Sequence, residues 1–133
     1  MLVRLLPLIT VGYACVLVIA THLPPSNAVV VAAAKAPDKF WHFFAYALLG
    51  FLTYASDTVL RPRAAYRFLL LGAGLILFAI CDELTQPIFG RGTDLWDFIY
   101  DLRGILTGFA AAYCLPRILK RLVWRPQSTS ADG

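Results

Sequence analysis

Apolar residues form four long stretches along the chain, and most polar residues lie between them. About 20 residues cross the hydrocarbon core of a bilayer as an α-helix, which rises about 1.5 Å per residue. Apolar stretches close to this length occur at about residues 5–23, 38–56, 66–86 and 97–119. The connections between them are short, which favours antiparallel neighbours. The pattern therefore predicts an all-α polytopic membrane protein, with a compact bundle of four transmembrane helices in a single domain at residues 1–125.

The composition agrees with a membrane environment. Of the 133 residues, 59% are hydrophobic and only 15% are charged, and the mean hydropathy is +0.69. Soluble domains carry roughly a quarter charged residues, so a chain this short cannot cover its core with a polar surface. A soluble domain and a wholly disordered chain are therefore excluded, although we expect the polar tail at residues 126–133 to be disordered and cytoplasmic.

The three cysteines, Cys15, Cys81 and Cys114, all lie inside apolar stretches. They show neither a C-x-x-C pair nor a Cys/His spacing that would indicate zinc. We therefore expect small buried apolar side chains, with no disulfide and no metal site formed by these residues.

Basic residues divide unequally between the two sides that an antiparallel bundle would present. The outer side holds four: Lys35, Lys39, Arg91 and Arg103. The inner side holds eight: Arg4, Arg61, Arg63, Arg67, Arg117, Lys120, Arg121 and Arg125. Positive residues accumulate in cytoplasmic loops, so we expect an inner (cytoplasmic) membrane protein with both termini cytoplasmic. No basic stripe with interleaved aromatic residues occurs, so the predicted partner is the lipid bilayer and not nucleic acid.

The first apolar stretch has a second interpretation as a cleavable secretory signal, with the alanine-rich segment at residues 31–36 as the cleavage region. The stretch is longer than the usual hydrophobic core of a signal, and the alanines lie well beyond its end. These features favour a retained helix.

Polar residues recur at helical spacing near the outer ends of three predicted helices. They are Asp38, His42 and Tyr46 on the second helix, Glu83 and Gln86 on the third, and Asp94, Asp97 and Asp101 on the fourth. Residues spaced by three or four positions share one helix face. The acidic stripe continues through Gly104 and Gly108, and small residues at this spacing allow two helices to approach closely. We therefore expect these polar faces to point into the bundle and to meet in one outward-opening site.

Some of these acids also have a simpler interpretation. Asp38 and Asp97 fall near predicted helix starts, where a carboxylate caps the helix and complements its dipole. Capping does not explain Glu83 with Gln86 at a helix end, nor Asp101 one turn inside, so these residues favour a functional network. Asp82 does not share the face of Glu83, and we expect it to reach the outer water.

Two segments resemble the signatures of VanZ-like membrane proteins. The first is DKFWHFFAYALLG at residues 38–50. The second begins with DELTQP at residues 82–87 and continues through Arg91, Asp94, Asp97, Gly104 and Gly108. Where the family usually has Asn, this chain has Asp101, which adds a possible negative charge. The resemblance implies a connection with teicoplanin-type glycopeptide resistance and leaves the biochemical activity open.

The first functional hypothesis is a binding protein of the cell envelope. Lys39 and Arg91 beside carboxylates and an amide would hold a polar headgroup, a lipid-linked envelope precursor or a glycopeptide, since the arginine fork suits phosphate and carboxylate groups. The expected binding residues are Asp38, Lys39, Tyr46, Gln86, Arg91, Asp94, Asp97 and Asp101.

The second hypothesis is an intramembrane enzyme that acts on a lipid-borne substrate. His42 would be the general base or acid and Glu83 its partner, while Gln86 and Arg91 would stabilise negative charge. No hydrolase or nucleotide-binding motif supports a particular reaction. A cofactor is not predicted, and neither is a metal, because acids stacked at a helix start are accounted for by the helix dipole.

The third hypothesis is a structural one, in which the outer charges fix helix register and the protein acts by contacting another membrane protein. The oligomeric state is left open.

Overall fold

The described part of the chain is entirely helical. The computed structural model describes residues 5–33, 37–60 and 65–123, and no strand occurs among them. The helices are α1 (Leu6–Thr21), α2 (Ala28–Ala33), α3 (Asp38–Leu60), α4 (Ala65–Thr85), the 3₁₀ turn η2 (Gln86–Phe89) and α5 (Leu95–Val123). The predicted all-α class is therefore confirmed for these residues, and a helix lies at each of the four expected positions. The tail at residues 126–133 lies outside them, as do Arg4, Lys35, Arg61, Arg63 and Arg125.

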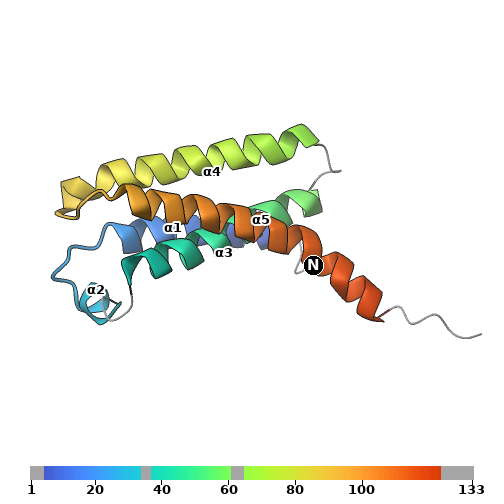
Figure 1. Cartoon of the computed structure of the whole chain (residues 1–133), viewed down its shortest axis with the longest axis horizontal. Coiled ribbons are helices and arrows are strands. Elements are labelled where there is room, and N and C mark those ends of the chain that lie inside the picture. The colour runs from blue at the N-terminus through green and yellow to red at the C-terminus, as the bar shows by residue number, and fades with distance from the viewer. Residues whose placement is uncertain (1–4, 34–36, 61–64, 124–133) are drawn as a thin grey trace, which may run out of the picture.

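The four long helices run side by side and antiparallel in sequence order (Figure 1). α3 and α5 pack most closely, α1 packs on α3, and α4 contacts both α5 and α3. Tyr13 on α1 donates a hydrogen bond of 3.0 Å to the carbonyl oxygen of Ala45 on α3. The short helix α2 was not predicted, because six residues are too few to establish a periodicity.

Glycines explain the close approach of α3 and α5. A Cβ atom on Gly104 would collide with the Phe43 carbonyl oxygen of α3, and one on Gly108 with that of Ala47. In the other direction, a Cβ on Gly50 would lie 2.8 Å from the Ile105 carbonyl oxygen. The expected glycine ridge therefore does face the bundle, and backbone packs directly on backbone.

A tight turn connects α4 to α5. Pro87 lies in the first turn of η2, and Gly90 ends it with a φ of 78°, a backbone conformation that glycine adopts without strain. The Asp94 carboxylate then accepts the backbone N–H of Trp96 at 2.9 Å, which caps the start of α5. This turn brings the end of α4 and the start of α5 to the same end of the molecule.

Two described helical segments are long and apolar enough to cross a membrane, Tyr66–Phe89 and Leu95–Ile118. α1 is apolar but has only 16 residues, and α3 has 23 residues with many polar ones among them. Two of the four predicted spans therefore meet the criteria of length and composition among the described residues, which weakly supports a membrane protein.

Large apolar side chains are exposed along all four long helices, as Leu69, Leu77 and Leu84 are on α4. Such a surface is unusual for a monomer in water and suits contact with lipid. The expectation of buried cysteines was wrong, because Cys15, Cys81 and Cys114 all lie on the exposed surface. A small thiol is apolar enough for either position, so the sequence did not distinguish the interior from the outward apolar face.

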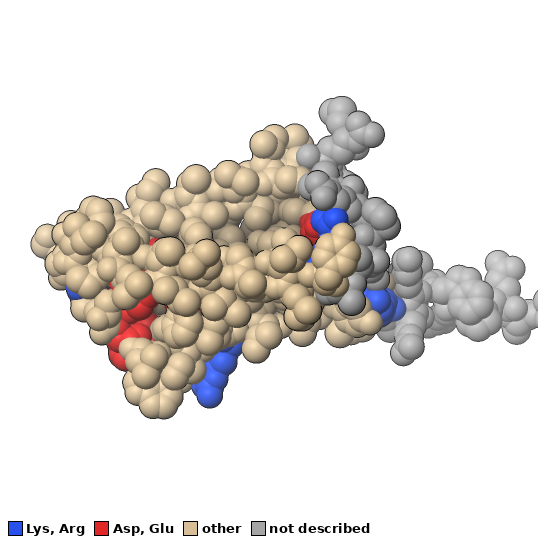
Figure 2. Space-filling view, turned by 90° about the horizontal axis from the view of Figure 1, so that it is seen from above, with Lys and Arg blue, Asp and Glu red and all other residues tan. Residues whose placement is uncertain are grey.

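Charged side chains are segregated along the long axis. Figure 2 shows acidic side chains gathered at the end of the molecule that holds the starts of α3 and α5. At the opposite end Arg67 binds Asp57 through two hydrogen bonds, and its Nε lies 3.1 Å from the Asp57 Oδ2 atom. The acidic end is called the outer end from here on.

Candidate functional site

The centre of the outer end is a histidine–carboxylate pair between α3 and α5. The His42 Nδ1 atom lies 2.9 Å from the Asp101 Oδ1 atom, and both side chains are buried. The close α3–α5 packing places Asp101, one turn before Gly104, directly against α3. The acid that departs from the VanZ-like pattern is thus the partner of the histidine.

Two further acids stand beside this pair. Ligand atoms of Asp38, His42 and Asp97 all lie within 4.8 Å of one another. Asp97 is 7% exposed, whereas Asp38 is exposed to solvent. Together with Asp101 these three residues are called the His42 cluster.

Two bases border the His42 cluster. The Lys39 ammonium lies 3.1 Å from the Asp94 Oδ2 atom and 3.7 Å from the Asp97 Oδ1 atom. The Arg91 guanidinium lies 3.4 Å from the Asp38 Oδ2 atom. Lys39 and Arg91 therefore both lie among carboxylates, as expected from the sequence.

Asp94 lies between the two candidate spans. Its pKa is lowered from the ordinary value, chiefly because its carboxylate accepts the Trp96 backbone N–H, and next because Lys39 donates a hydrogen bond to it. Asp94 is therefore fully charged at neutral pH and serves as the cap of α5.

Glu83 and Gln86 are both buried at the end of α4. The Glu83 Oε1 atom accepts the backbone N–H of Asp94 at 2.6 Å, and its Oε2 atom accepts the Gln86 side-chain amide at 3.3 Å. Glu83 also has a carboxylate oxygen within 4.8 Å of ligand atoms of His42 and Asp101. Glu83 thus lies near His42, but the carboxylate that is hydrogen-bonded to the imidazole is Asp101.

The expectation that Asp82 reaches the outer water was wrong. Asp82 is 4% exposed, and its Oδ1 atom accepts the Thr21 hydroxyl of α1 at 2.7 Å. Its Oδ2 atom accepts the Tyr46 hydroxyl of α3 at 3.1 Å. These three residues, called the Asp82 network, join α1, α3 and α4. Tyr46, expected in the binding site, belongs to this network.

The physical reason for the Asp82 error is that α4 packs on more than one neighbour. Consecutive residues on a helix point about 100° apart, so Asp82 and Glu83 do face different directions. Asp82 points toward α1 and α3, whereas Glu83 points toward the start of α5. The sequence does show a second acid, Asp82, next to Glu83 near the end of the same helix. It does not show which helix lies opposite Asp82.

Apolar residues extend the buried face of α4 toward the middle of the helix. Ala79 and Leu75 continue the buried face below Glu83, while Ile76 is 40% exposed. The buried face therefore follows the four-residue spacing at this point and not the three-residue spacing.

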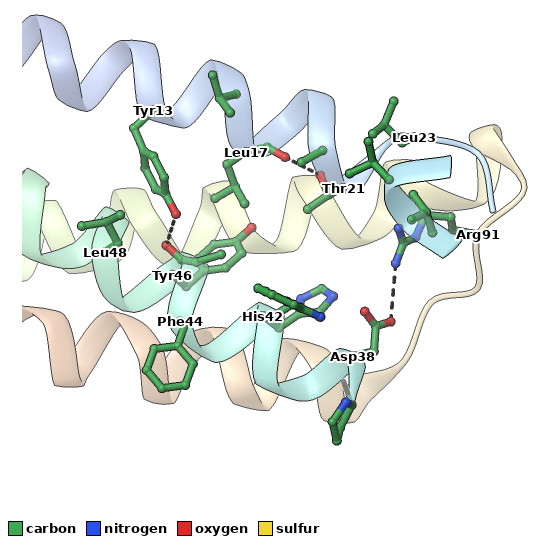
Figure 3. Close-up of a pocket in the computed structure, with 17 residues that line it drawn as sticks. Tyr13, Leu17, Thr21, Leu23, Asp38, His42, Phe44, Tyr46, Leu48 and Arg91 are labelled. Carbon is green, nitrogen blue, oxygen red and sulfur yellow. Dashed lines mark hydrogen bonds and ion pairs between the residues drawn. The ribbon is translucent and has the colours of Figure 1, made fainter. Parts of the chain in front are cut away.

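An apolar groove leads away from the His42 cluster. It has a volume of about 810 Å³ and is lined by α1, α2 and α3, with Arg91 at its outer end. Figure 3 shows His42, Asp38 and Arg91 at one end of the groove and Tyr13 and Leu48 toward the other. The groove is thus polar at the outer end and apolar along its length.

Two buried carboxylate oxygens accept no hydrogen bond from any described residue, the Asp97 Oδ1 atom and the Asp101 Oδ2 atom. Buried polar atoms are nearly always paired, because leaving one unpaired costs about 1–3 kcal/mol. The His42 cluster is therefore an incompletely satisfied polar site that opens into an apolar groove.

Comparison with known proteins does not assign a family or a function to the chain. No family model, no curated protein and no solved structure matches the chain.

Proposed function

We propose that this chain is a VanZ-like integral membrane protein of the inner membrane, with four transmembrane helices and both termini cytoplasmic. We further propose that its outward-facing site binds the headgroup of a cell-envelope lipid or of a lipid-linked envelope precursor. The two signature segments support the family, and the exposed apolar surface together with two span-length helices supports the membrane. Hydrogen bonds from α1 to α3 and α4 support its retention in the bundle.

The observation that carries the binding proposal is the continuity of the groove with the polar outer end. A lipid has the same division, with an apolar chain and a polar headgroup, and the groove offers apolar walls from Val16 to Leu48 for the chain. Arg91 at the outer end offers the planar donor fork that suits phosphate.

The binding test uses the full chain purified in detergent, with a polyprenyl phosphate as the probe and native mass spectrometry as the measurement. Filling the groove by Val16→Trp and removing the fork by Arg91→Ala should each lower occupancy at least about tenfold. The matched control is Leu77→Trp, an equally exposed apolar residue of α4 outside the groove. Equal occupancy in wild type and Val16→Trp would contradict the proposal.

The topology is tested by cysteine labelling of intact cells, with the three natural cysteines changed to serine. Gly92→Cys, in the turn before α5, should react with an impermeant maleimide from outside. Arg63→Cys, outside the described residues, should react only after the cells are opened. The reverse pattern would invert the proposed orientation.

The link to glycopeptide resistance is tested by teicoplanin susceptibility of cells that express the wild type or His42→Ala. We expect wild-type expression to lower sensitivity and the variant to lose this effect at equal abundance in the membrane. A variant that is active at equal abundance would separate the site from any resistance role.

A catalytic alternative has one specific observation in its favour. Asp101 holds the Nδ1 atom of His42, which is the arrangement that orients a histidine for general acid–base chemistry at its other nitrogen. Turnover of an envelope lipid extract by wild-type protein, absent in His42→Ala and reduced in Glu83→Gln, would favour the enzyme. The structural alternative predicts instead that these substitutions mainly lower the amount of protein in the membrane.

A further inference from the structure

The His42 cluster carries more negative charge than its neighbours balance. His42 is surrounded by Asp38, Asp97 and Asp101, and Glu83 also lies close to it. Lys39 forms an ion pair with Asp97 at 3.7 Å, beyond hydrogen-bonding distance, and among the described acids the Arg91 guanidinium pairs with the exposed Asp38. Carboxylates gathered at low dielectric are relieved by a proton or by a cation that pairs with them, and a bound cation leaves them charged.

The histidine is held as metal-binding histidines are held. Such a histidine gives one ring nitrogen to the metal and donates its other N–H to a carboxylate, which fixes the ring orientation. In this chain Asp101 accepts from Nδ1 at 2.9 Å, so Nε2 is the nitrogen left to bind a ligand. Asp101 therefore occupies the supporting position, outside the direct ligand set.

Glu83 and Asp97 are the two acids that could complete the site, and they differ in whether their oxygens already accept hydrogen bonds. Both oxygens of Glu83 are already acceptors, one from the Asp94 backbone and one from Gln86. The Asp97 Oδ1 atom, in contrast, is buried and accepts no hydrogen bond from a described residue. Of these two acids, Asp97 is therefore the one with an oxygen that an ion would bind, in place of its 3.7 Å contact with the Lys39 ammonium.

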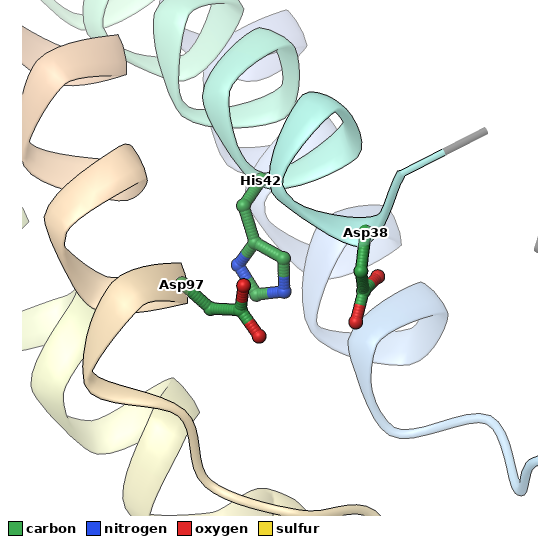
Figure 4. Close-up of side chains that lie close together, drawn as sticks. All are labelled: Asp38, His42 and Asp97. Carbon is green, nitrogen blue, oxygen red and sulfur yellow. The ribbon is translucent and has the colours of Figure 1, made fainter.

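We propose that His42, Asp97 and Asp38 bind a first-row divalent metal ion, with Asp101 orienting the histidine. Their ligand atoms lie within 4.8 Å of one another (Figure 4). Donor atoms around Zn²⁺ lie about 3.3–3.6 Å apart, since each bond is about 2.0–2.2 Å, so the side chains need to close by roughly 1 Å. One imidazole and two carboxylates suit Zn²⁺ or Mn²⁺ better than Mg²⁺ or Ca²⁺, which prefer all-oxygen sites.

The proposed ion deepens the proposed function and rests on it for its role. Asp38 and His42 line the groove, so an ion with three protein ligands would keep an open position toward a bound headgroup. A phosphate would then meet a cation at a site whose own side chains are mainly acidic. The helix dipole, which accounts for the stacked acids at the start of α5, does not account for this set, because its ligands come from two helices and include an imidazole.

The test measures metal retention by the full untagged chain in detergent, without added lipid. After treatment with EDTA and dialysis against micromolar Zn²⁺, wild type should retain one ion per chain. His42→Gln and Asp97→Asn should weaken binding at least about 100-fold, and Asp101→Asn about 10–100-fold as an orienting residue. Asp57→Asn is the control, an acid at the opposite end of the molecule that pairs with Arg67, and should bind Zn²⁺ within about threefold of wild type.

Thermal unfolding with and without Zn²⁺ distinguishes a variant that has lost the metal site from one that has failed to fold. Zn²⁺ should raise the Tm of wild type and of Asp57→Asn but not that of Asp97→Asn, which should have a normal Tm without metal. Retention by wild type no greater than by Asp97→Asn overturns the metal site. If that result is accompanied by lipid binding that EDTA does not affect, the metal site is wrong and the proposed lipid binding stands. If metal binds but Val16→Trp binds lipid normally, the proposed lipid binding is wrong and the metal site stands.

Discussion

The Asp82 network and the His42 cluster lie at the same end of the molecule, and both are centred on buried carboxylates, but they differ in how fully their hydrogen bonds are made. In the Asp82 network each carboxylate oxygen accepts a hydroxyl, from Thr21 or from Tyr46. In the His42 cluster, Asp97 and Asp101 each keep a buried oxygen without a hydrogen-bond donor among the described residues.

This difference separates two uses of buried polar groups. A fully paired network fixes how helices pack and has no capacity left for a ligand. An incompletely paired one costs stability and is retained where a ligand completes it. We therefore expect substitutions in the Asp82 network to affect folding, and substitutions in the His42 cluster to affect binding.

The largest effect should come from breaking the helix packing that supports the His42 cluster. Gly104→Val would place side-chain atoms into the α3 backbone at Phe43 and Ala47, so we expect a loss of more than about 3 kcal/mol of stability and little folded protein in the membrane. The control is Gly74→Val, since a Cβ at Gly74 has no heavy atom within 4 Å. Membrane abundance and Tm measure both, and a folded Gly104→Val protein with normal Tm would refute the close packing.

The next largest effect should come from the Asp82 network. Asp82→Ala leaves the buried Tyr46 hydroxyl without its acceptor and breaks the Thr21 link from α1 to α4, although Thr21 keeps the Leu17 carbonyl oxygen, so we expect a cost of about 1–3 kcal/mol. Thermal unfolding in detergent measures the loss. Zn²⁺ retention by the fraction that folds should stay close to wild type. A stable Asp82→Ala protein that has lost ligand binding would reverse the roles given to the two groups.

A smaller effect on stability, with a large effect on binding, is expected for Asp97→Asn. The substitution removes a buried charge whose Oδ1 atom lacks a hydrogen-bond donor, so the free energy of unfolding should change by less than about 1 kcal/mol or rise slightly. The same protein should lose metal retention. A large drop in Tm would show instead that Asp97 is structurally required, as Asp82 is expected to be.

Helical periodicity was sufficient to predict most of this outer end. The spacing of Asp38 and His42, and of Asp97 and Asp101, placed each pair on one face, and Gly104 indicated that the face meets another helix. These inferences needed only the geometry of a single helix. They yielded the helices at all four positions and brought His42 near its acids.

Pairing between helices could not be predicted in the same way. Periodicity does not say which neighbour faces a given residue, so Glu83 was expected to be the partner of His42, whereas Asp101 holds it. For the same reason Asp82 was assigned to water although it binds α1 and α3. The satisfied and unsatisfied groups differ only in these contacts between helices, and therefore the contrast between them required the structure.

The smallest effect should come from Asp94, whose side chain is partly exposed and which lies beside the His42 cluster without belonging to it. Its lowered pKa means that the folded state favours the charged carboxylate, through the Trp96 N–H and then Lys39. The resulting stabilisation is present above the ordinary aspartate pKa of about 4 and is lost as the pH falls through the lower folded value. Asp94→Asn should remove this acid-side dependence of Tm and leave metal retention nearly unchanged. If Asp94→Asn instead abolished retention, the ion would be held by the exposed acidic surface, and the buried unpaired oxygens would no longer distinguish the His42 cluster.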